Sequence, residues 1–367
     1  MSTATLDGKS IGLDEAYQHA ASLLGAARFP LVAGLGADAL GARAAILLAE
    51  RLRGAYDHLA SDISLRDVEV TRSFGIFVTT PNEARLRADL VLLVGSSLSA
   101  QWPGIFDRLA LGQAPQRGAQ SGALRQVVWL GADAAEAAKA GANVKTIAAT
   151  AEQIPGVLAV WRARLGGRPV ALEPAKVELI DALVASFKAA RFGVVVWSST
   201  ESDALTIEML QALVTDLNVT TRFTGVPIGA RSGAAGVTQV SGWLTGVPPR
   251  TGFGRGYPEH DPWRFEARRL VESGESDAAL WISAYDGEAP SWSSDKVPLV
   301  TLAPTGAAVK RGLHIEVGRP GETHDGVEFS QEIGAFTLRK ATKPSPLPSV
   351  AEAIREISAR ISENTRC

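Results

Sequence analysis

The segment around Gly34 contains the residues best suited to binding a dinucleotide. Gly34, Gly36 and Ala39 form a G-x-G-x-x-A pattern between an apolar run and a helical pattern, and Asp57 follows about twenty residues later. Glycines at such a turn let a pyrophosphate approach the backbone, and the acidic side chain binds a ribose hydroxyl. The same pattern arises wherever a strand turns tightly into a helix, and here a helical pattern precedes the supposed first strand. NAD binding by Gly34, Gly36 and Asp57 is therefore an alternative hypothesis.

Histidine and acidic residues give a weaker signal for metal chemistry. The five histidines form neither H-x-x-x-H nor H-E-x-x-H spacing. His314, Glu316, His324 and Asp325 lie close in sequence, and strand alternation could place His314 and Glu316 on one face. We interpret this group as the exposed polar face of a hairpin. The sequence also contains no G-x-x-x-x-G-K-[ST] phosphate-binding loop.

Composition excludes several classes of protein. Hydrophobic residues make up 46% and charged residues 21% of the 367 residues, and the net charge is -2. These values exclude a disordered chain and give no support for nucleic-acid binding. The single cysteine, Cys367, excludes a disulfide framework, a cysteine-rich zinc site and a self-contained iron–sulfur cluster. We find no signal-peptide pattern and no membrane-spanning stretch, so we expect a soluble cytoplasmic protein that binds neither nucleic acid nor membrane.

The elements that must position these residues alternate between strand and helix. Helical patterns cover 13–28, 37–53, 134–140, 175–190, 203–217 and 348–362, and apolar strand-like runs cover 31–36, 88–95, 126–132, 192–199, 277–284 and 297–304. This predicts an α/β fold with two Rossmann-like parallel-sheet domains. We expect the first domain at 1–165, the second at 175–340 and a C-terminal helix and tail at 341–367. Residues 313–341 are expected to form short antiparallel strands.

The segment 225–258 and the tryptophans point to binding surfaces. This segment carries nine glycines and little helical periodicity, so we expect a long functional loop over a sheet edge. Tryptophans within strand-like runs should be core, whereas those in loop-like stretches could anchor interfaces. The first group is Trp197 and Trp281, and the second is Trp102, Trp243, Trp263 and Trp292. Four tryptophans in loops favour a protein that works within a complex.

Several runs resemble one family. Residues 231–263 (RSGAAGVTQVSGWLTGVPPRTGFGRGYPEHDPW), 275–290, 56–75, 82–97 and 313–329 are similar to the B subunit of formylmethanofuran dehydrogenase, a relative of the molybdopterin oxidoreductases. The resemblance extends from roughly residue 13 to residue 338. It implies the two Rossmann-like central domains of that family.

The departures from this family concern its metal centre. The resemblance implies that a catalytic member has an N-terminal cysteine cluster and a cysteine or selenocysteine ligand to molybdenum or tungsten. The corresponding segment here, about 60–68, offers Asp62 and Ser64 but no thiol. After the strand that ends near Gly95, the expected Asn-Pro and His/Arg pattern is replaced by Ser96–Leu98 and Gln101–Trp102. Without a cluster to carry electrons away, redox turnover would stall. We therefore assign no catalytic, cofactor-binding or metal-ligating residue and expect no cofactor.

This combination resembles the B-like subunits of bacterial formyltransferase/hydrolase complexes. That resemblance implies a structural subunit without catalytic activity, assembled with an amidohydrolase-type metal-dependent hydrolase, a formyltransferase and a further structural subunit. Such complexes move formyl groups from formyl-tetrahydromethanopterin to a methanofuran-like carrier and release formate. The alternatives are a residual molybdopterin-dependent dehydrogenase with a metal held by Asp62 or Ser64, and the NAD-binding enzyme described above.

Overall fold

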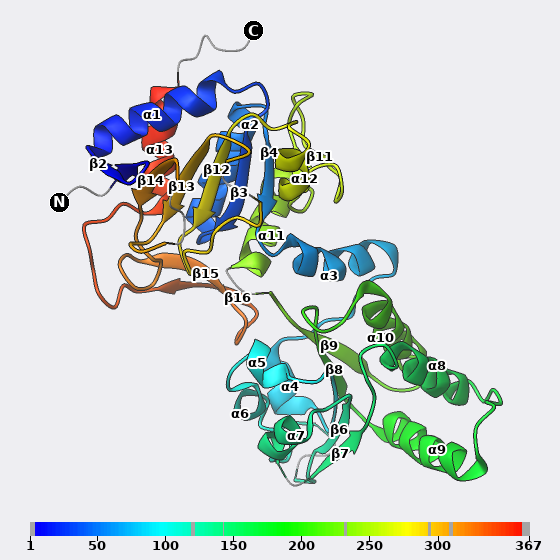
Figure 1. Cartoon of the computed structure of the whole chain (residues 1–367). Helices are drawn as coiled ribbons and strands as arrows, with labels where there is room; N and C mark the ends of the chain where they lie inside the picture. The colour runs from blue at the N-terminus through cyan, green and yellow to red at the C-terminus, as the bar shows by residue number, and fades with distance from the viewer. Residues whose placement is uncertain are drawn as a thin grey trace. The chain divides into compact units, whose positions relative to one another are not determined.

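The computed structural model describes residues 4–118, 122–141, 143–230, 233–292, 295–307 and 311–361, which form two compact units (Figure 1). Unit 1 comprises Met1–Leu65, Arg231–Phe329 and Phe336–Cys367, and unit 2 comprises Arg66–Ala230 and Ser330–Ala335. The two units therefore do not follow the linear boundaries expected from the sequence, since residues 165–175 lie inside unit 2. The physical reason is strand pairing, because the first strands of unit 1 pair with strands that come after unit 2 in the sequence.

Unit 1 contains a nine-stranded sheet in the order β11-β10-β4-β3-β12-β13-β14-β1-β2. Its strands are β1 (Ala4–Leu6), β2 (Lys9–Ile11), β3 (Leu31–Gly36), β4 (Ala55–His58), β10 (Thr251–Gly252), β11 (Glu259–His260), β12 (Ala279–Ser283), β13 (Leu299–Ala303) and β14 (Leu313–Glu316). The five strands from β4 to β14 are parallel, whereas the pairs at both edges are antiparallel. The α/β class is confirmed, and this sheet is mixed.

Alternating apolar residues explain how the sheet of unit 1 is buried. In β12, Leu280 and Ile282 join one core cluster, while Ala279 and Trp281 join another. A strand buried on both faces needs this continuous apolar run. The helices that pack around the sheet are α1 (Leu13–Ala26), α2 (Ala39–Arg51), α11 (Ala234–Thr245), α12 (Ala267–Glu272) and α13 (Val350–Arg360). A separate two-stranded sheet pairs β15 (Gly326–Ser330) with β16 (Ala335–Arg339).

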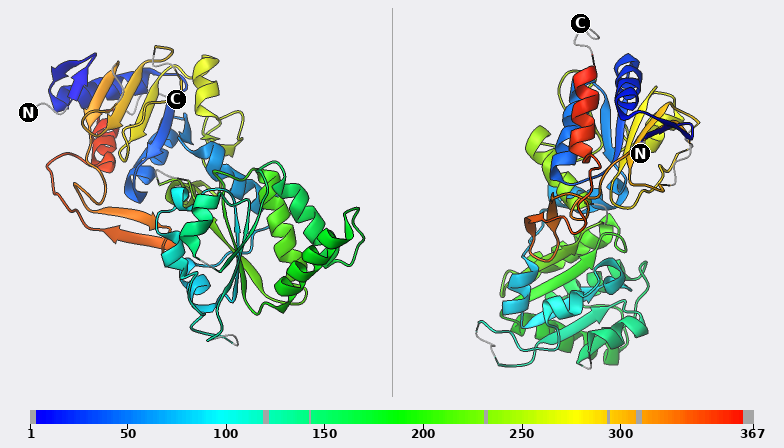
Figure 2. Two further views of the ribbon diagram at one scale, coloured as in Figure 1. Left: turned by 60° about the horizontal axis from the view of Figure 1, so that its bottom comes forward. Right: turned by 90° about the vertical axis from the view of Figure 1, so that its left-hand side faces the viewer.

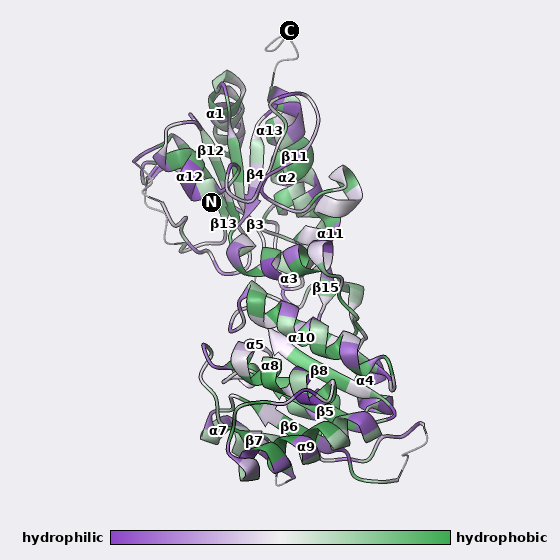
Figure 3. Cartoon of the chain, turned by 90° about the vertical axis from the view of Figure 1, so that its right-hand side faces the viewer, coloured by the Kyte–Doolittle hydropathy of each residue, from purple (hydrophilic) through white to green (hydrophobic). Residues whose placement is uncertain are grey.

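Unit 2 is a five-stranded parallel sheet in the order β7-β6-β5-β8-β9. Its strands are β5 (Leu90–Val94), β6 (Gln126–Leu130), β7 (Val144–Ile147), β8 (Gly193–Ser198) and β9 (Phe223–Ile228). Its helices are α4 (Pro81–Arg87), α5 (Leu98–Gln101), α6 (Ile105–Leu109), α7 (Ala134–Ala140), α8 (Ile154–Leu165), α9 (Pro174–Ala189) and α10 (Ala204–Leu217), and α3 (Ser61–Ser73) leads into the unit. Helices cover both faces of this sheet (Figure 2, left), and its central strands β5 and β8 are strongly apolar (Figure 3).

The glycine-rich segment differs from the expected loop. It contains the 12-residue helix α11. Gly233, at φ 78°, precedes this helix and Gly246, at φ 75°, follows it, so two of the glycines are helix caps. The segment does continue to a sheet edge, where β10 pairs with β4 and β11. The high glycine content led us to predict a loop here. Glycine is common both in loops and at helix caps, so its frequency does not distinguish the two.

The segment 313–341 also differs in part from the expected antiparallel strands. β14 pairs parallel with β13 on one side and antiparallel with β1 on the other. β14 therefore extends the parallel centre of unit 1, which alternation alone could not predict. Among the described residues, no helix is both long and apolar enough to cross a membrane.

Candidate functional site

The candidate site of unit 1 lies at the carboxyl ends of β3 and β12. The chain continues from β3 toward one edge of the sheet and from β12 toward the other, so these neighbouring strands mark a switch point of the topology. Ligands of open α/β sheets bind in the crevice at such a point. Two cavities line this end of the sheet, with volumes of about 270 and 230 Å³. Asp38, Tyr285 and Glu328 line the larger cavity, and Asp57 and Arg250 line the smaller one.

The glycines of the G-x-G-x-x-A pattern are required by packing. Gly34 has φ 82°, and a Cβ atom on it would lie 2.4 Å from the Ile282 carbonyl oxygen of β12. A Cβ atom on Gly36 would lie 3.3 Å from the Ser283 Cα atom. Both glycines therefore let β3 approach β12 closely, and this gives them a structural role that needs no ligand.

Asp38 occupies the position where a dinucleotide would place its pyrophosphate. Its carboxylate accepts hydrogen bonds from the Gly41 amide at 2.9 Å and the Val327 amide at 3.1 Å, and it caps α2. Burial, together with the nearby carboxylates of Glu328 and Asp38, raises the pKa of the Tyr285 hydroxyl. Asp38 and Glu328 thus place two carboxylates on the wall of the larger cavity, and Glu328 is paired with Arg339 at 3.0 Å. The carboxylate of Asp38, which forms no ion pair with the described residues, disfavours a phosphate ligand there.

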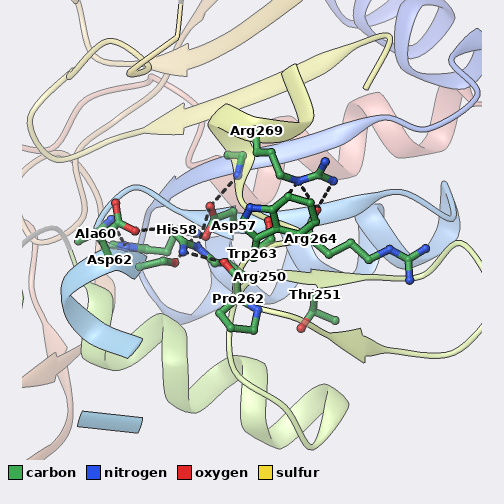
Figure 4. Close-up of polar contacts among 12 residues, drawn as sticks. Asp57, His58, Ala60, Asp62, Arg250, Thr251, Pro262, Trp263, Arg264 and Arg269 are labelled. Carbon is green, nitrogen blue, oxygen red and sulfur yellow. Dashed lines mark hydrogen bonds and ion pairs between the residues drawn. The ribbon is translucent and has the colours of Figure 1, made fainter. Parts of the chain in front are cut away.

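Asp57 is held by partners within the protein (Figure 4). Its Oδ2 atom accepts a hydrogen bond from the Ala267 amide at 2.9 Å and lies 3.5 Å from the Arg250 Nε atom. Arg250 also donates from Nη2 to Asp62 at 2.5 Å and from Nη1 to the Pro262 carbonyl at 2.8 Å. Burial raises the pKa of Asp57 to about 6, although the Arg250 guanidinium opposes that shift. Asp57 is therefore the buried member of a charge network with Arg250 and Asp62, and its geometry does not favour ribose binding.

The residues at the expected position of the metal ligand do not form a metal site. The Asp62 side chain is 75% exposed and paired with Arg250. The Ser64 hydroxyl is buried and has no hydrogen-bond partner. Within the described ranges, no group of three or more His, Cys, Asp or Glu side chains could hold a metal ion. The donor set therefore does not fit a molybdenum or tungsten centre.

The acidic and histidine residues near β14 have separate partners. His314 Nε2 lies 3.2 Å from the Ala303 carbonyl oxygen, and Asp325 accepts from Lys340 at 2.6 Å. His324 contacts the Thr323 hydroxyl through Nδ1 at 3.3 Å. These contacts agree with a structural role. The expected exposed face of a hairpin is wrong, because His314 and Glu316 are half-buried on β14, which lies between β13 and β1 in the nine-stranded sheet.

In unit 2, the backbone amides of Ser96 and Ser97 bind the Glu201 carboxylate. Sequence reasoning did not select Glu201, Arg250 or Asp38. Asp38 has the sequence signal of a helix N-cap, since it directly precedes a helical pattern. The other two have no local signal, because their partners are far away in the sequence.

Comparison with known proteins places this chain in a family, although no family model matches it. The B subunit of the formyltransferase/hydrolase complex Fhc of Methylorubrum extorquens is 31% identical over 363 residues, which are 98% of this chain and 97% of that protein. A chain of the crystal structure of the formyltransferase/hydrolase complex FhcABCD from the same organism, in complex with methylofuran, matches with a TM-score of 0.88 and 31% identity, covering 98% of both chains. The B subunit of tungsten-containing formylmethanofuran dehydrogenase 2 of Methanococcus maripaludis is 26% identical over 374 residues, covering 97% of this chain and 85% of that protein. The chain therefore belongs to the family of formyltransferase/hydrolase complex B subunits, which is related to the B subunits of formylmethanofuran dehydrogenases.

Proposed function

We propose that this chain is a non-catalytic structural subunit of a formyltransferase/hydrolase complex. Its partners in this proposal are an amidohydrolase-type metal-dependent hydrolase, a formyltransferase and a further structural subunit. The complex transfers formyl groups from formyl-tetrahydromethanopterin to a methanofuran-like carrier and releases formate. The chemistry takes place on the other subunits.

The end-to-end similarity to the Fhc B subunit carries this proposal. The match covers 98% of this chain and 98% of the corresponding chain in the FhcABCD complex. Two carboxylates held within the chain support it from a different direction. Asp38 in unit 1 and Glu201 in unit 2 occupy backbone amides at the two switch points, where a dinucleotide cofactor would place its phosphate groups.

The proposal is tested by purifying the complex with and without this chain. We expect the hydrolase and transferase subunits to assemble poorly when the chain is left out, and the rate of formate release to fall with assembly. Elemental analysis of the complete complex should find no stoichiometric molybdenum or tungsten. Stoichiometric metal together with a released pterin would favour the residual dehydrogenase.

The isolated chain provides the complementary measurement. It should show no formate-dependent reduction of an artificial electron acceptor, because its described residues hold no metal-ligand cluster. Millimolar NAD should not raise its midpoint of thermal unfolding, since a ligand that binds only the folded state would raise it by mass action. Turnover with formate in the absence of partners would overturn the structural role.

A further inference from the structure

The loop after β5 binds a carboxylate that comes from another loop of unit 2. Glu201 Oε2 accepts hydrogen bonds from the Ser96 amide at 2.5 Å, the Ser96 hydroxyl at 3.0 Å and the Ser97 amide at 3.1 Å. Its Oε1 atom lies 3.2 Å from the same Ser97 amide. Two successive amides that converge on one anion form a nest of the kind that binds phosphate and carboxylate groups in proteins.

This nest lies at the switch point of the unit 2 sheet. The chain passes from β5 to β6 and β7 on one side and from β8 to β9 on the other, so the loops after the adjacent strands β5 and β8 diverge. Gly95 has φ 122°, and a Cβ atom on it would lie 2.7 Å from Glu201 Oε2. Glycine at this position therefore lets the carboxylate reach the backbone amides.

Both sides of the nest are fixed by further hydrogen bonds. On one side, the Trp129 indole donates to the Gly95 carbonyl oxygen at 2.7 Å. On the other, Arg66 Nη1 donates to the carbonyl oxygens of Ser199 at 2.6 Å and Ser202 at 3.2 Å, which flank Glu201. Asp67 accepts a hydrogen bond from the Ser199 hydroxyl as well. The carboxylate is thus presented to the amides by a loop whose position is set by α3.

A second carboxylate binds the same loop. Glu136 of α7 accepts from the Ser99 amide at 3.2 Å and from the Ser99 hydroxyl at 2.8 Å, and Lys139 pairs with it at 2.5 Å. Residues 96–99 therefore bind internal anions at three of their four backbone amides. Such saturation leaves little positive potential for a phosphate group from outside.

We propose that Ser96 and Ser97 form an anion-binding nest whose resident ligand is the Glu201 carboxylate, and that the nest accepts a free carboxylate when this side chain is removed. The inference goes beyond the structural role proposed above, because it assigns a binding capacity to unit 2 itself. It does not depend on the partner subunits.

The test is chemical rescue of Glu201→Ala in the whole chain, within its complex if it is purified that way. The probes are sodium acetate and, separately, inorganic phosphate, each compared with sodium chloride at equal ionic strength. We expect the variant to unfold at a lower temperature than wild type. Acetate should restore part of that loss along a saturable curve, with no such effect on wild type. Glu178→Ala, which removes an exposed carboxylate from α9, is the matched control and should not respond.

The outcomes distinguish the nest from other sites. Saturable stabilisation of Glu201→Ala by acetate, absent from wild type, supports the proposal, and a similar response to phosphate shows that the vacated nest accepts both anions. Equal stabilisation of wild type and variant, or no saturable response to either anion, overturns it.

If Glu201→Ala does not fold, Glu201→Gln provides a second readout. Its Ser96 and Ser97 amide protons should shift upfield in NMR spectra, and unchanged shifts would contradict the nest. The rescue experiment and the assembly experiment are independent. A variant that acetate does not stabilise would contradict the nest, whereas a complex that assembles without this chain would contradict the proposed function.

Discussion

Asp57 shows how a single buried carboxylate can make stability depend on pH. Burial raises its pKa in the folded protein to about 6, above the ordinary value of 3.8, while Arg250 acts in the opposite direction. At a pH between these two pKa values, Asp57 is therefore more often protonated in the folded protein than in the unfolded chain. It follows that the contribution of Asp57 to the free energy of unfolding falls as pH rises from about 4 to about 6.

Asp57→Asn should remove this dependence. Across pH 4 to 7, wild type should lose stability relative to the variant, by an amount on the order of 3 kcal/mol. The measurement is urea unfolding of both proteins at several pH values. Parallel profiles for the two proteins would show that Asp57 does not titrate in this range. The variant as a whole can be less stable than wild type, because Arg250 loses a partner, so the slope of the difference is the diagnostic quantity.

Gly34 allows a sharp test of whether the G-x-G pattern serves packing. A methyl group at this position meets the Ile282 carbonyl oxygen and forces an alanine into a positive φ. Gly34→Ala should therefore lower the free energy of unfolding by at least about 2 kcal/mol. Gly242→Ala is the matched control, because nothing lies within 4 Å of its added Cβ atom in α11. The control should be neutral or stabilising by up to about 1 kcal/mol. Equal effects of both substitutions in denaturant titrations would contradict the packing role.

At the scale of elements, the sequence signals that succeed are local ones. The C-terminal helix α13 lies within its expected range, and Ser349 and Glu352 form a capping box at its start. Helix α11 was missed because its glycines resemble those of a loop. The antiparallel strands β1 and β2 were also missed, since three-residue edge strands carry too little pattern to detect.

Asp38 caps helix α2 and also links this helix to strand β15. The carboxylate binds the Gly41 amide of α2 and the Val327 amide of β15, so it ties two elements together. Asp38→Ala should cost about 2 kcal/mol or more and speed hydrogen exchange at the Val327 amide. Asp133→Ala, which removes the more exposed cap of α7, should cost about 1 kcal/mol or less. Unchanged exchange at Val327 would show that the link to β15 is not formed in solution.

At the scale of the whole molecule, the tryptophans separate into core and surface. Trp197 and Trp281 are buried, as predicted, whereas Trp243 and Trp263 are 66% and 69% exposed. The other two tryptophans expected in loops, Trp102 and Trp292, are buried, and Trp243 lies in helix α11 and not in a loop. Trp263 is held in place, because Arg269 lies 4.5 Å from its ring and pairs with Glu275. Tryptophan is among the side chains that dominate binding at protein interfaces.

Trp263→Ala should therefore weaken association with the partner subunits of the proposed complex by at least about tenfold. The unfolding free energy should change by no more than about 0.5 kcal/mol, because the ring is exposed. Association is measured by titrating the partner subunits with labelled chain. Leu179→Ala, which removes an exposed apolar side chain of α9, should leave the affinity unchanged. An unchanged affinity for Trp263→Ala would exclude this surface as a hot spot.

The sequence by itself determined the α/β class, the order of most buried strands and helices, and the presence of a single cysteine, Cys367. These properties follow from apolar periodicity and residue type, which are local. The resemblance to the B subunit of formylmethanofuran dehydrogenase also came from the sequence, and comparison with known proteins confirmed it.

The tertiary structure alone decided what the candidate residues do. Gly34 contacts β12, which lies about 250 residues away, and Glu201 binds amides 105 and 104 residues before it. The order of the parallel strands in a sheet depends on how the apolar faces of all the strands are buried at once. No local sequence pattern encodes that order. The carboxylates that fill the backbone amides at both switch points are therefore visible only after folding has brought distant loops together.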